Sequence, residues 1–323
     1  MELETINQTI TDPADWDGSL FGTQLELVQL EGGEFRSEQT VTDIGSGVKL
    51  LRLTVNQSIT VRSRPLTMRF VATLFDQAHG GHYAGASIKA GRMLVMPPAF
   101  DFDACVKDGA FSSSTLFVPA EPLEACFKTL VGEEIPALDS LKIATPSAGS
   151  IQWITAWPDL VTAEHLASLS QPQKANLQES LLDSALTLLT HNLQNSTPGD
   201  PSELEKSADA SRLAKARKLV RLAEDYSHNS PDVSLRMVDL CKATQVSERT
   251  LQYAFKACLG ISPMNYLKRQ RLHQVRHELK FADPAVTTVS SIACQFGFFH
   301  FGEFSQAYKA QFDESPSKTL KQA

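Results

Sequence analysis

The chain has 323 residues, of which 42% are hydrophobic and 21% charged, and a formal net charge of −7 at pH 7, which is ordinary for a soluble globular protein of two domains. The sequence opens without a basic and apolar leader, and no apolar run is long enough to cross a bilayer, so we expect a cytoplasmic protein without membrane contacts. Five cysteines without a C-x-x-C pair argue against a disulfide framework and a structural zinc site, and we expect reduced, mostly buried thiols.

Residues 1–158 are predicted to form a β-rich domain. In KLLRLTVN, which covers residues 49–56, apolar and polar residues alternate with the period of a half-buried strand. Similar short runs at 69–75, 91–98 and 114–119 are bounded by Gly, Pro or Ser, which favours an antiparallel sandwich or barrel. Such a domain is expected to hold a small apolar pocket with a few polar groups. Trp153 and Trp157 would either line this pocket or pack where the sheet meets a helix.

Sustained helical periodicity begins in the next segment, 159–194, which we assign to a helical connector. Its apolar residues recur at steps of three and four, so they form a stripe along one face of a helix. The stripe consists of Leu177, Leu181, Leu182, Ala185, Leu188, Leu189 and Leu193. One interpretation is packing on the chain's own core, and the other is a dimerisation helix that forms the seam of a homodimer.

Residues 195–211 are predicted to be a flexible linker, because they are rich in Ser, Pro, Gly and Asp and contain almost no apolar side chains. The remaining segment, 212–323, is predicted to be all helical. It contains 17 Lys and Arg against 10 Asp and Glu, a net charge of +7, whereas residues 1–211 carry −14. An acidic domain joined to a basic one is typical of a protein that binds a polyanion through its basic part.

The basic segment repeats one pattern of apolar residues, serines and prolines. Leu251, Phe255, Leu259, Ser262, Pro263 and Leu267 are matched 53 positions later by Phe304, Tyr308, Phe312, Ser315, Pro316 and Leu320. Upstream, Leu240, Cys241, Gln245 and Val246 are matched 52 positions later by Ile292, Ala293, Gly297 and Phe298, so one residue is inserted at the turn. Each copy comprises a short helix, a tight turn and an amphipathic helix, which indicates two helix-turn-helix motifs.

The second helix of each motif has an outer face suited to duplex DNA. Arg can donate two hydrogen bonds to guanine, Gln can pair with adenine, and Lys can neutralise phosphate. In a single helix, such a polar face could equally be a surface exposed to solvent. The repetition of the motif and the positive charge favour the interpretation as a DNA-binding surface. The first face holds Arg249, Gln252, Tyr253 and Lys256, preceded by Glu248 and by Ser247 as N-cap. The second face is smaller and more neutral and holds His300, Phe301, Gly302, Ser305, Gln306 and Lys309.

Between the motifs, Ser262 as N-cap and Pro263 as first helical residue are predicted to begin a helix that runs to about Leu279. At about 1.5 Å per residue, this helix would be a strut of roughly 25 Å. Such a strut could hold two recognition helices in successive major grooves, about 34 Å apart. We expect it to face the DNA, because it carries five basic residues, namely Lys268, Arg269, Arg271, Arg276 and Lys280.

Residues 213–320 resemble the DNA-binding domain of the AraC/XylS family of bacterial transcription regulators. The resemblance rests on LCKATQVSERTLQYAFKACLGISPMNYLKRQRL and SSIACQFGFFHFGEFSQAYKAQFDESPS. It implies specific binding to double-stranded promoter DNA, activation through contact with RNA polymerase, and an N-terminal domain that senses a small-molecule effector or mediates dimerisation. It also implies base-facing positions at Arg249, Gln252, Tyr253, Phe301, Gly302, Ser305 and Gln306.

The sequence departs from the family pattern at several positions. Gln245 stands where Gly is common in the first turn, and His300 stands where a small polar cap is common in the second motif. Phe301 and Gly302 replace polar residues, so the second motif is expected to hold the DNA backbone more than the bases. The strand pattern, with NQSITVRS and VMPPAFDFDA, resembles the cupin-like effector domains of the same family.

We therefore expect an α+β fold, with an N-terminal β-rich cupin-like sensor domain, a helical connector and a C-terminal all-α domain with two helix-turn-helix motifs. We expect no enzymatic activity, no cofactor and no metal site, since the paired His273 and His277 lack the Glu of H-E-x-x-H. The alternative is a β-domain enzyme, such as a metal-dependent cupin or a thiol transferase, that carries an accessory DNA-binding module.

Overall fold

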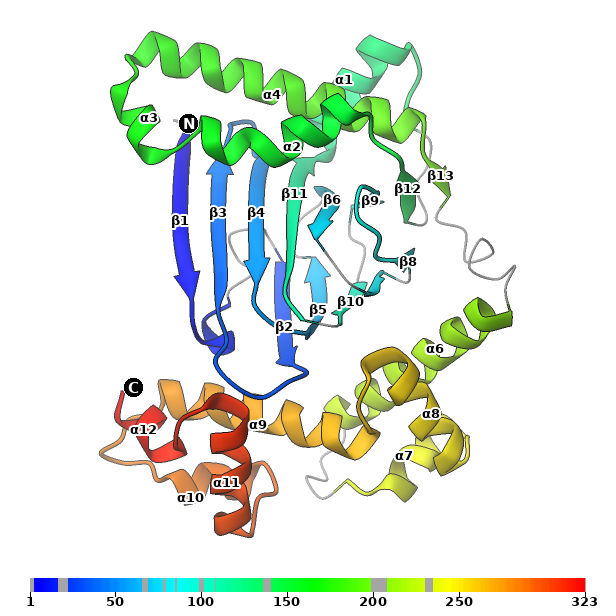
Figure 1. The fold of residues 1–323 in the computed structure, drawn as a ribbon, viewed down its shortest axis with the longest axis vertical. Helices are drawn as coiled ribbons and strands as arrows, with labels where there is room; N and C mark the ends of the chain where they lie inside the picture. The colour runs from blue at the N-terminus through cyan, green and yellow to red at the C-terminus, as the bar shows by residue number, and fades with distance from the viewer. Residues whose placement is uncertain are drawn as a thin grey trace.

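The N-terminal part of the protein consists of two antiparallel sheets, and its C-terminal part consists of helices (Figure 1). The computed structural model describes residues 3–16, 23–65, 69–77, 80–84, 86–98, 102–107, 109–135, 141–198, 208–229 and 235–322. Helices α1 to α4 lie at one end of the sheets and the C-terminal helices lie at the opposite end (Figure 1). The expected α+β organisation is confirmed.

The larger sheet has eight strands and the smaller has five. The larger sheet has the order β1 (Glu4–Ile10), β3 (Ser37–Asp43), β4 (Lys49–Val55), β11 (Phe111–Pro119), β6 (Arg69–Gln77), β9 (Met93–Met96), β12 (Lys142–Ala144) and β13 (Thr197–Pro198). The smaller has the order β2 (Thr23–Gln29), β5 (Ile59–Pro65), β10 (Phe102–Val106), β7 (Gly81–Tyr83) and β8 (Ala86–Ser87). A 3₁₀ turn, η1 (Pro13–Asp15), lies between β1 and β2.

The facing sides of the two sheets form a common core. The alternation in β4 directs Leu51, Leu53 and Val55 into this core, where they meet Leu27 of β2 and Ile59 of β5. These side chains are at most 9% exposed, so they are shielded from solvent where the two sheets pack face to face. The four strand segments expected from the sequence are all present, as parts of β4, β6, β9 and β11.

A second core lies between the larger sheet and the helices α1 (Ala120–Val131), α2 (Ala148–Leu160), α3 (Ala163–Ser168) and α4 (Gln171–Gln194). The apolar stripe of α4 packs into it, because Leu181, Ala185 and Leu189 are at most 4% exposed. Packing on the chain's own core is therefore correct for this stripe, and the dimer seam is wrong for its buried residues. Trp157 is fully buried in the same core, which confirms packing rather than a pocket wall.

The C-terminal helices form two further cores. Their bounds are α6 (Ala208–Asn229), α7 (Met237–Thr244), α8 (Glu248–Leu259), α9 (Pro263–Phe281), α10 (Val289–Gln295), α11 (Phe301–Phe312) and α12 (Pro316–Lys321). The first half of α9 packs with α6, α7 and α8, and its second half packs with α10, α11 and α12. Within the described ranges, no helix is long and apolar enough to cross a membrane.

Two observed elements cross the limits expected from the sequence. Helix α2 runs through residue 158, and α6 begins at Ala208, inside the segment assigned to the linker. Residues 199–207 of that segment lie outside the described residues. The predicted α9 strut is confirmed as a helix of 19 residues, about 28 Å long at 1.5 Å per residue.

Candidate nucleic-acid interface

The first helix-turn-helix motif consists of α7, a turn at residues 245–247, and α8. Gln245 ends α7 in the left-handed conformation, with φ 55°, which bends the chain sharply toward α8. The hydroxyl of Ser247 then accepts a hydrogen bond from the backbone N–H of Thr250 at 3.3 Å, so Ser247 is the N-cap, as predicted. Leu251 and Phe255 are fully buried and fix α8 on its core.

The second motif consists of α10, a turn at residues 296–300, and α11. Gly297 has φ 78° and stands at the position that matches Gln245, so both motifs use a left-handed residue in the turn. His300 precedes α11 without a side-chain capping hydrogen bond. The residue inserted in this turn is Phe299, which is 62% exposed. The two motifs therefore share their backbone path but differ at the start of the second helix.

The segments after the two recognition helices also correspond. Gly260 ends α8 and Asp313 ends α11, both in the left-handed conformation. Ser262 then caps α9 and Ser315 caps α12, each followed by proline at the first helical position. The repeat inferred from the sequence is thus a repeat of structure.

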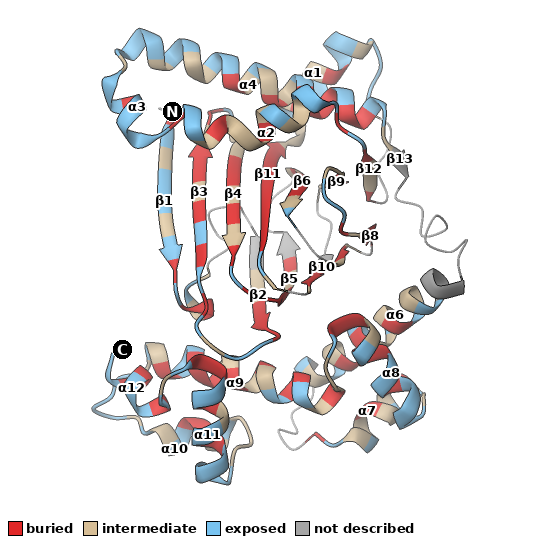
Figure 2. Ribbon diagram, viewed as in Figure 1, coloured by how far each residue is buried: buried red, intermediate tan, exposed pale blue. Residues whose placement is uncertain are grey.

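The outer faces of α8 and α11 are exposed (Figure 2). Tyr253 is 61% exposed and Phe301 is 44% exposed, although both are large apolar or amphipathic side chains. The side chain of Gln252 donates to the Glu248 carboxylate at 2.8 Å, which orients both groups on the first turn of α8. All twelve residues expected at the DNA are exposed, namely Ser247, Glu248, Arg249, Gln252, Tyr253, Lys256, His300, Phe301, Gly302, Ser305, Gln306 and Lys309.

Two exposed residues at the same surface were not singled out in the sequence. Thr250 lies beside Ser247, with 2.9 Å between the two hydroxyl oxygens, at the N-terminal end of α8. Phe299 precedes the N-cap of α11. The signal for Phe299 is the offset change from 52 to 53, which identifies an inserted residue in the second turn.

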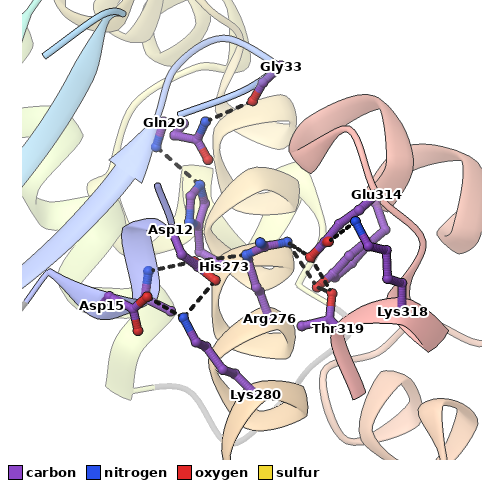
Figure 3. A network of polar contacts seen from close by, with 12 residues as sticks. Asp12, Asp15, Gln29, Gly33, His273, Arg276, Lys280, Glu314, Lys318 and Thr319 are labelled. Carbon is purple, nitrogen blue, oxygen red and sulfur yellow. Dashed lines mark hydrogen bonds and ion pairs between the residues drawn. The ribbon is translucent and has the colours of Figure 1, made fainter. Parts of the chain in front are cut away.

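The expectation that the α9 strut faces DNA with all its basic residues is wrong. The Nε of Arg276 donates to Asp12 at 2.9 Å, and its Nη1 lies 2.8 Å from a Glu314 carboxylate oxygen (Figure 3). Lys280 donates to Asp12 at 3.0 Å and also pairs with Asp15. Burial opposes ionisation of Asp12, but the hydrogen bond and charge of Arg276, with hydrogen bonds from the Ala14 backbone and from Lys280, prevail and lower the pKa of Asp12. This part of α9 therefore binds the β-domain.

His273 lies on the same side of α9 and is a neutral hydrogen-bond acceptor in the contact with the β-domain. Its Nε2 accepts a hydrogen bond from the backbone N–H of Gln29 at 3.1 Å (Figure 3). Burial, assisted by the charge of Arg276, lowers the pKa of His273 to about 3, so the ring is neutral at pH 7 and can accept this bond. Within the described part of the chain, no group of three or more His, Cys, Asp or Glu is arranged to hold a metal ion.

A second set of ionic contacts joins the smaller sheet to α6. His228 Nε2 lies 2.8 Å from a carboxylate oxygen of Glu26, and Arg62 pairs with Asp225. The bond to Glu26 raises the pKa of His228. Burial raises the pKa of the neighbouring Glu224 to about 7. The contact region between the two parts of the chain thus includes one carboxyl group, that of Glu224, whose pKa lies near neutral pH.

Two of the five thiols are unsuited to a thiol transferase. Cys105 and Cys258 are buried, whereas Cys126, Cys241 and Cys294 are partly exposed, so the expectation of mostly buried thiols is wrong; all five cysteines are free. Burial raises the pKa of Cys105 to about 12 and that of Cys258 to about 11, so neither is a thiolate at pH 7.

A cleft of about 840 Å³ lies between β2 and α9. Its apolar lining includes Trp16, Leu27, Phe281 and Phe296, and its polar lining includes Gln274. This size is within the range of small-molecule sites. The sequence placed a pocket inside the β-rich domain, whereas this cleft is built by residues of both parts of the chain.

Comparison with known proteins supports the assignment of the C-terminal domain as a helix-turn-helix domain. A family model described as a helix-turn-helix domain matches residues 240–322. The probable thc operon regulatory protein of Rhodococcus erythropolis is 40% identical over 103 residues, and the XylDLEGF operon transcriptional activator 3 of Pseudomonas putida is 33% identical over 88 residues. These matches cover 32% and 27% of this chain, and 31% and 27% of the respective relatives.

The solved structure of a probable AraC family transcriptional regulator from Rhodopseudomonas palustris CGA009 is 35% identical to the matched part of this chain. The match covers 33% of this chain and 97% of that one, with a TM-score of 0.30.

Proposed function

We propose that this protein is a sequence-specific DNA-binding regulator of transcription of the AraC/XylS type, and an activator that responds to a ligand, since residues 240–322 match a helix-turn-helix domain and the same part of the chain is similar to operon regulators. The observation that carries the proposal is the pair of equivalent helices, α8 and α11, which both expose a polar face at opposite ends of the single helix α9. Two such faces on one chain suit two successive major grooves of a duplex. We assign no catalytic activity to the chain.

The first motif would read bases and the second would mainly hold the backbone. On α8, Arg249 would donate to guanine, Gln252 would pair with adenine and Lys256 would neutralise a phosphate. The backbone amides at the N-terminus of α8, next to Ser247, suit a further phosphate. Glu248 would orient Gln252, to which it is bonded, and Tyr253 would contact the DNA further along the helix. On α11, Lys309 would contact phosphate, and Gly302 and Ser305, at the positions that match Arg249 and Gln252, have no side chain or only a short one with which to reach the bases. The other residues of this face are His300, Phe301 and Gln306.

The partners that follow from this proposal are double-stranded promoter DNA, RNA polymerase and a small-molecule effector. We place the effector in the cleft between β2 and α9, because a ligand there would contact both the β-domain and the helix that links the two motifs. A homodimer also stays part of the proposal, with any contact outside the buried residues of the α4 stripe. The division into 1–158, 159–194, 195–211 and 212–323 is proposed as the functional organisation of the chain.

Selection of bound sites from random duplex DNA tests the proposal on the full-length protein. We expect enrichment of one bipartite sequence, with affinity that falls steeply as salt concentration rises, because phosphate contacts release counterions. Retention of DNA without preference over bulk competitor would refute sequence-specific regulation.

Two single variants test which motif reads bases. Arg249→Ala should weaken binding to the selected site by about 5- to 150-fold, the range expected for a lost base contact of about 1 to 3 kcal/mol. Gly302→Ala is the matched control on α11. A Cβ at Gly302 would meet nothing within 4 Å, so this variant should retain the fold and nearly all affinity. Comparable losses for the two variants in a binding titration would contradict the assigned roles.

A further inference from the structure

We propose that the β-domain determines the spacing between the two half-sites on DNA, by fixing the C-terminal ends of both recognition helices. This inference rests on the proposed function. The two contacts are independent, and each involves one motif.

The first contact joins the loop after β2 to the end of α11. The backbone N–H of Gly33 donates to the carbonyl oxygen of Gln311 at 3.1 Å. In return, the side-chain amide of Gln311 donates to the carbonyl oxygens of Glu31 at 2.9 Å and Gln29 at 3.4 Å. Gln311 is only 5% exposed, so these bonds are shielded from water.

Gly32 brings this loop against the helix backbone. A Cβ at Gly32 would lie 2.3 Å from the carbonyl oxygen of Ala310, a distance that real Cβ atoms do not show. The loop can therefore approach α11 this closely only with glycine at this position. Any larger residue must move the loop away from the helix or shift the helix itself.

The second contact joins β10 and the residue after it to the end of α8. The ammonium group of Lys107 donates to the carbonyl oxygen of Ala257 at 2.6 Å, and the Cys105 thiol donates to the carbonyl oxygen of Cys258 at 3.6 Å. A cation at the C-terminal end of a helix is favourable, because unpaired carbonyls give that end a partial negative charge. Cys105 also belongs to the apolar core that contains α6 and α8.

The two contacts have a fixed separation in the β-domain. Strands β2 and β10 both pair with β5, on opposite edges of it, so they are about 10 Å apart, twice the usual strand spacing. The two motifs have separate cores and share α9 as their link. A single helix can curve or bend, whereas a second, rigid connection through the sheet holds α8 and α11 at one separation. One base pair is about 3.4 Å along the duplex, so small changes in this separation alter the preferred spacing.

Site selection with the full-length protein and its variants tests this inference. Gly32→Ala forces the loop from α11, and Gly149→Ala is the matched control, since a Cβ at Gly149 meets only the Ser147 hydroxyl at 3.8 Å. Gln311→Met removes the amide donor without adding bulk, and it decides the question if Gly32→Ala fails to fold. Circular dichroism and thermal unfolding establish the folded state of each variant.

We expect wild type and Gly149→Ala to select two half-sites at one spacing. Gly32→Ala and Gln311→Met should select the same half-site sequences over several spacings, and bind the wild-type spacing about tenfold more weakly because preorganisation is lost. Folded variants that keep the single spacing would overturn the inference and leave the proposed function intact. Absence of any enriched sequence for the wild type would overturn the proposed function, and this inference with it.

Discussion

Replacing Asp12 by Asn removes one negative charge from the buried contacts that join α9 to the β-domain. The side chain of Asp12 is 11% exposed and that of Arg276 is 9% exposed. Asn retains the shape of the side chain and an oxygen for the backbone N–H of Ala14, which Asp12 accepts at 2.9 Å. The capping of η1 therefore persists, and the change mainly removes the charge that faces Arg276 and Lys280.

The expected loss in the free energy of unfolding depends on how well Arg276 and Lys280 remain paired after the substitution. Hydrogen bonds to charged groups contribute about 1.5 to 3 kcal/mol each, and removal of one member of a buried ion pair costs about 3 to 5 kcal/mol. Arg276 keeps its second carboxylate, Glu314, at 2.8 Å, so its charge is not left unpaired and the cost falls within the range for a hydrogen bond to a charged group. We expect Asp12→Asn to lower the free energy of unfolding by about 2 kcal/mol.

Asp15→Asn is the matched control, because Asp15 also pairs with Lys280 but its side chain is 47% exposed. An exposed pair contributes at most about 1 kcal/mol, and salt screens it. Urea unfolding followed by tryptophan fluorescence measures both changes, and Trp16 lies next to η1. With a slope of about 2 kcal/mol per molar urea, the midpoint should fall by about 1 M for Asp12→Asn and by much less for Asp15→Asn.

The difference in the free energy of unfolding between wild type and Asp12→Asn should become smaller as the pH falls. The pKa of Asp12 is lowered in the folded protein, so its contribution is present above the ordinary value of 3.8 and is lost as pH falls through the folded pKa. Wild type and Asp12→Asn should therefore differ fully at pH 7 and converge in acid. Equal midpoints for Asp12→Asn and Asp15→Asn at pH 7 would refute the account of this interface.

Two further substitutions should stabilise the protein, in contrast to Asp12→Asn. Gln245→Gly should raise the free energy of unfolding by about 0.5 to 1 kcal/mol, because it relieves the left-handed strain at φ 55°. Thermal unfolding measures this change, and Ala243→Gly, inside α7, is a control that should destabilise the protein. Glu224→Gln should stabilise the protein at pH 8 but not at pH 4.5, because burial raises the pKa of Glu224 from 4.5 to about 7 and its ionisation then costs up to about 1.4 kcal/mol per pH unit in that window. Urea midpoints across pH 4.5 to 8 that stay parallel for wild type and Glu224→Gln would contradict the assigned pKa.

The sequence by itself determined the two helix-turn-helix motifs. These motifs depend on relations between residues at most four positions apart, namely the capping by Ser247 and Ser262, the proline directly after the second cap of each copy, and the spacing of the buried Leu251 and Phe255. Such local relations follow directly from helix geometry. The exposed faces of α8 and α11 could be identified for the same reason, and the inserted Phe299 could be located from the change of offset.

Only the tertiary structure decided what the basic residues of α9 contact. Arg276 and Lys280 have the composition of a DNA-binding surface, but their partners are Asp12 and Asp15, more than 260 positions earlier. The α4 stripe likewise gave no indication whether its partner was the chain's own sheet or a second copy. Helical periodicity shows which face of a helix is apolar or charged, whereas the surface that meets this face depends on long-range chain packing, which leaves no periodic signal in the sequence.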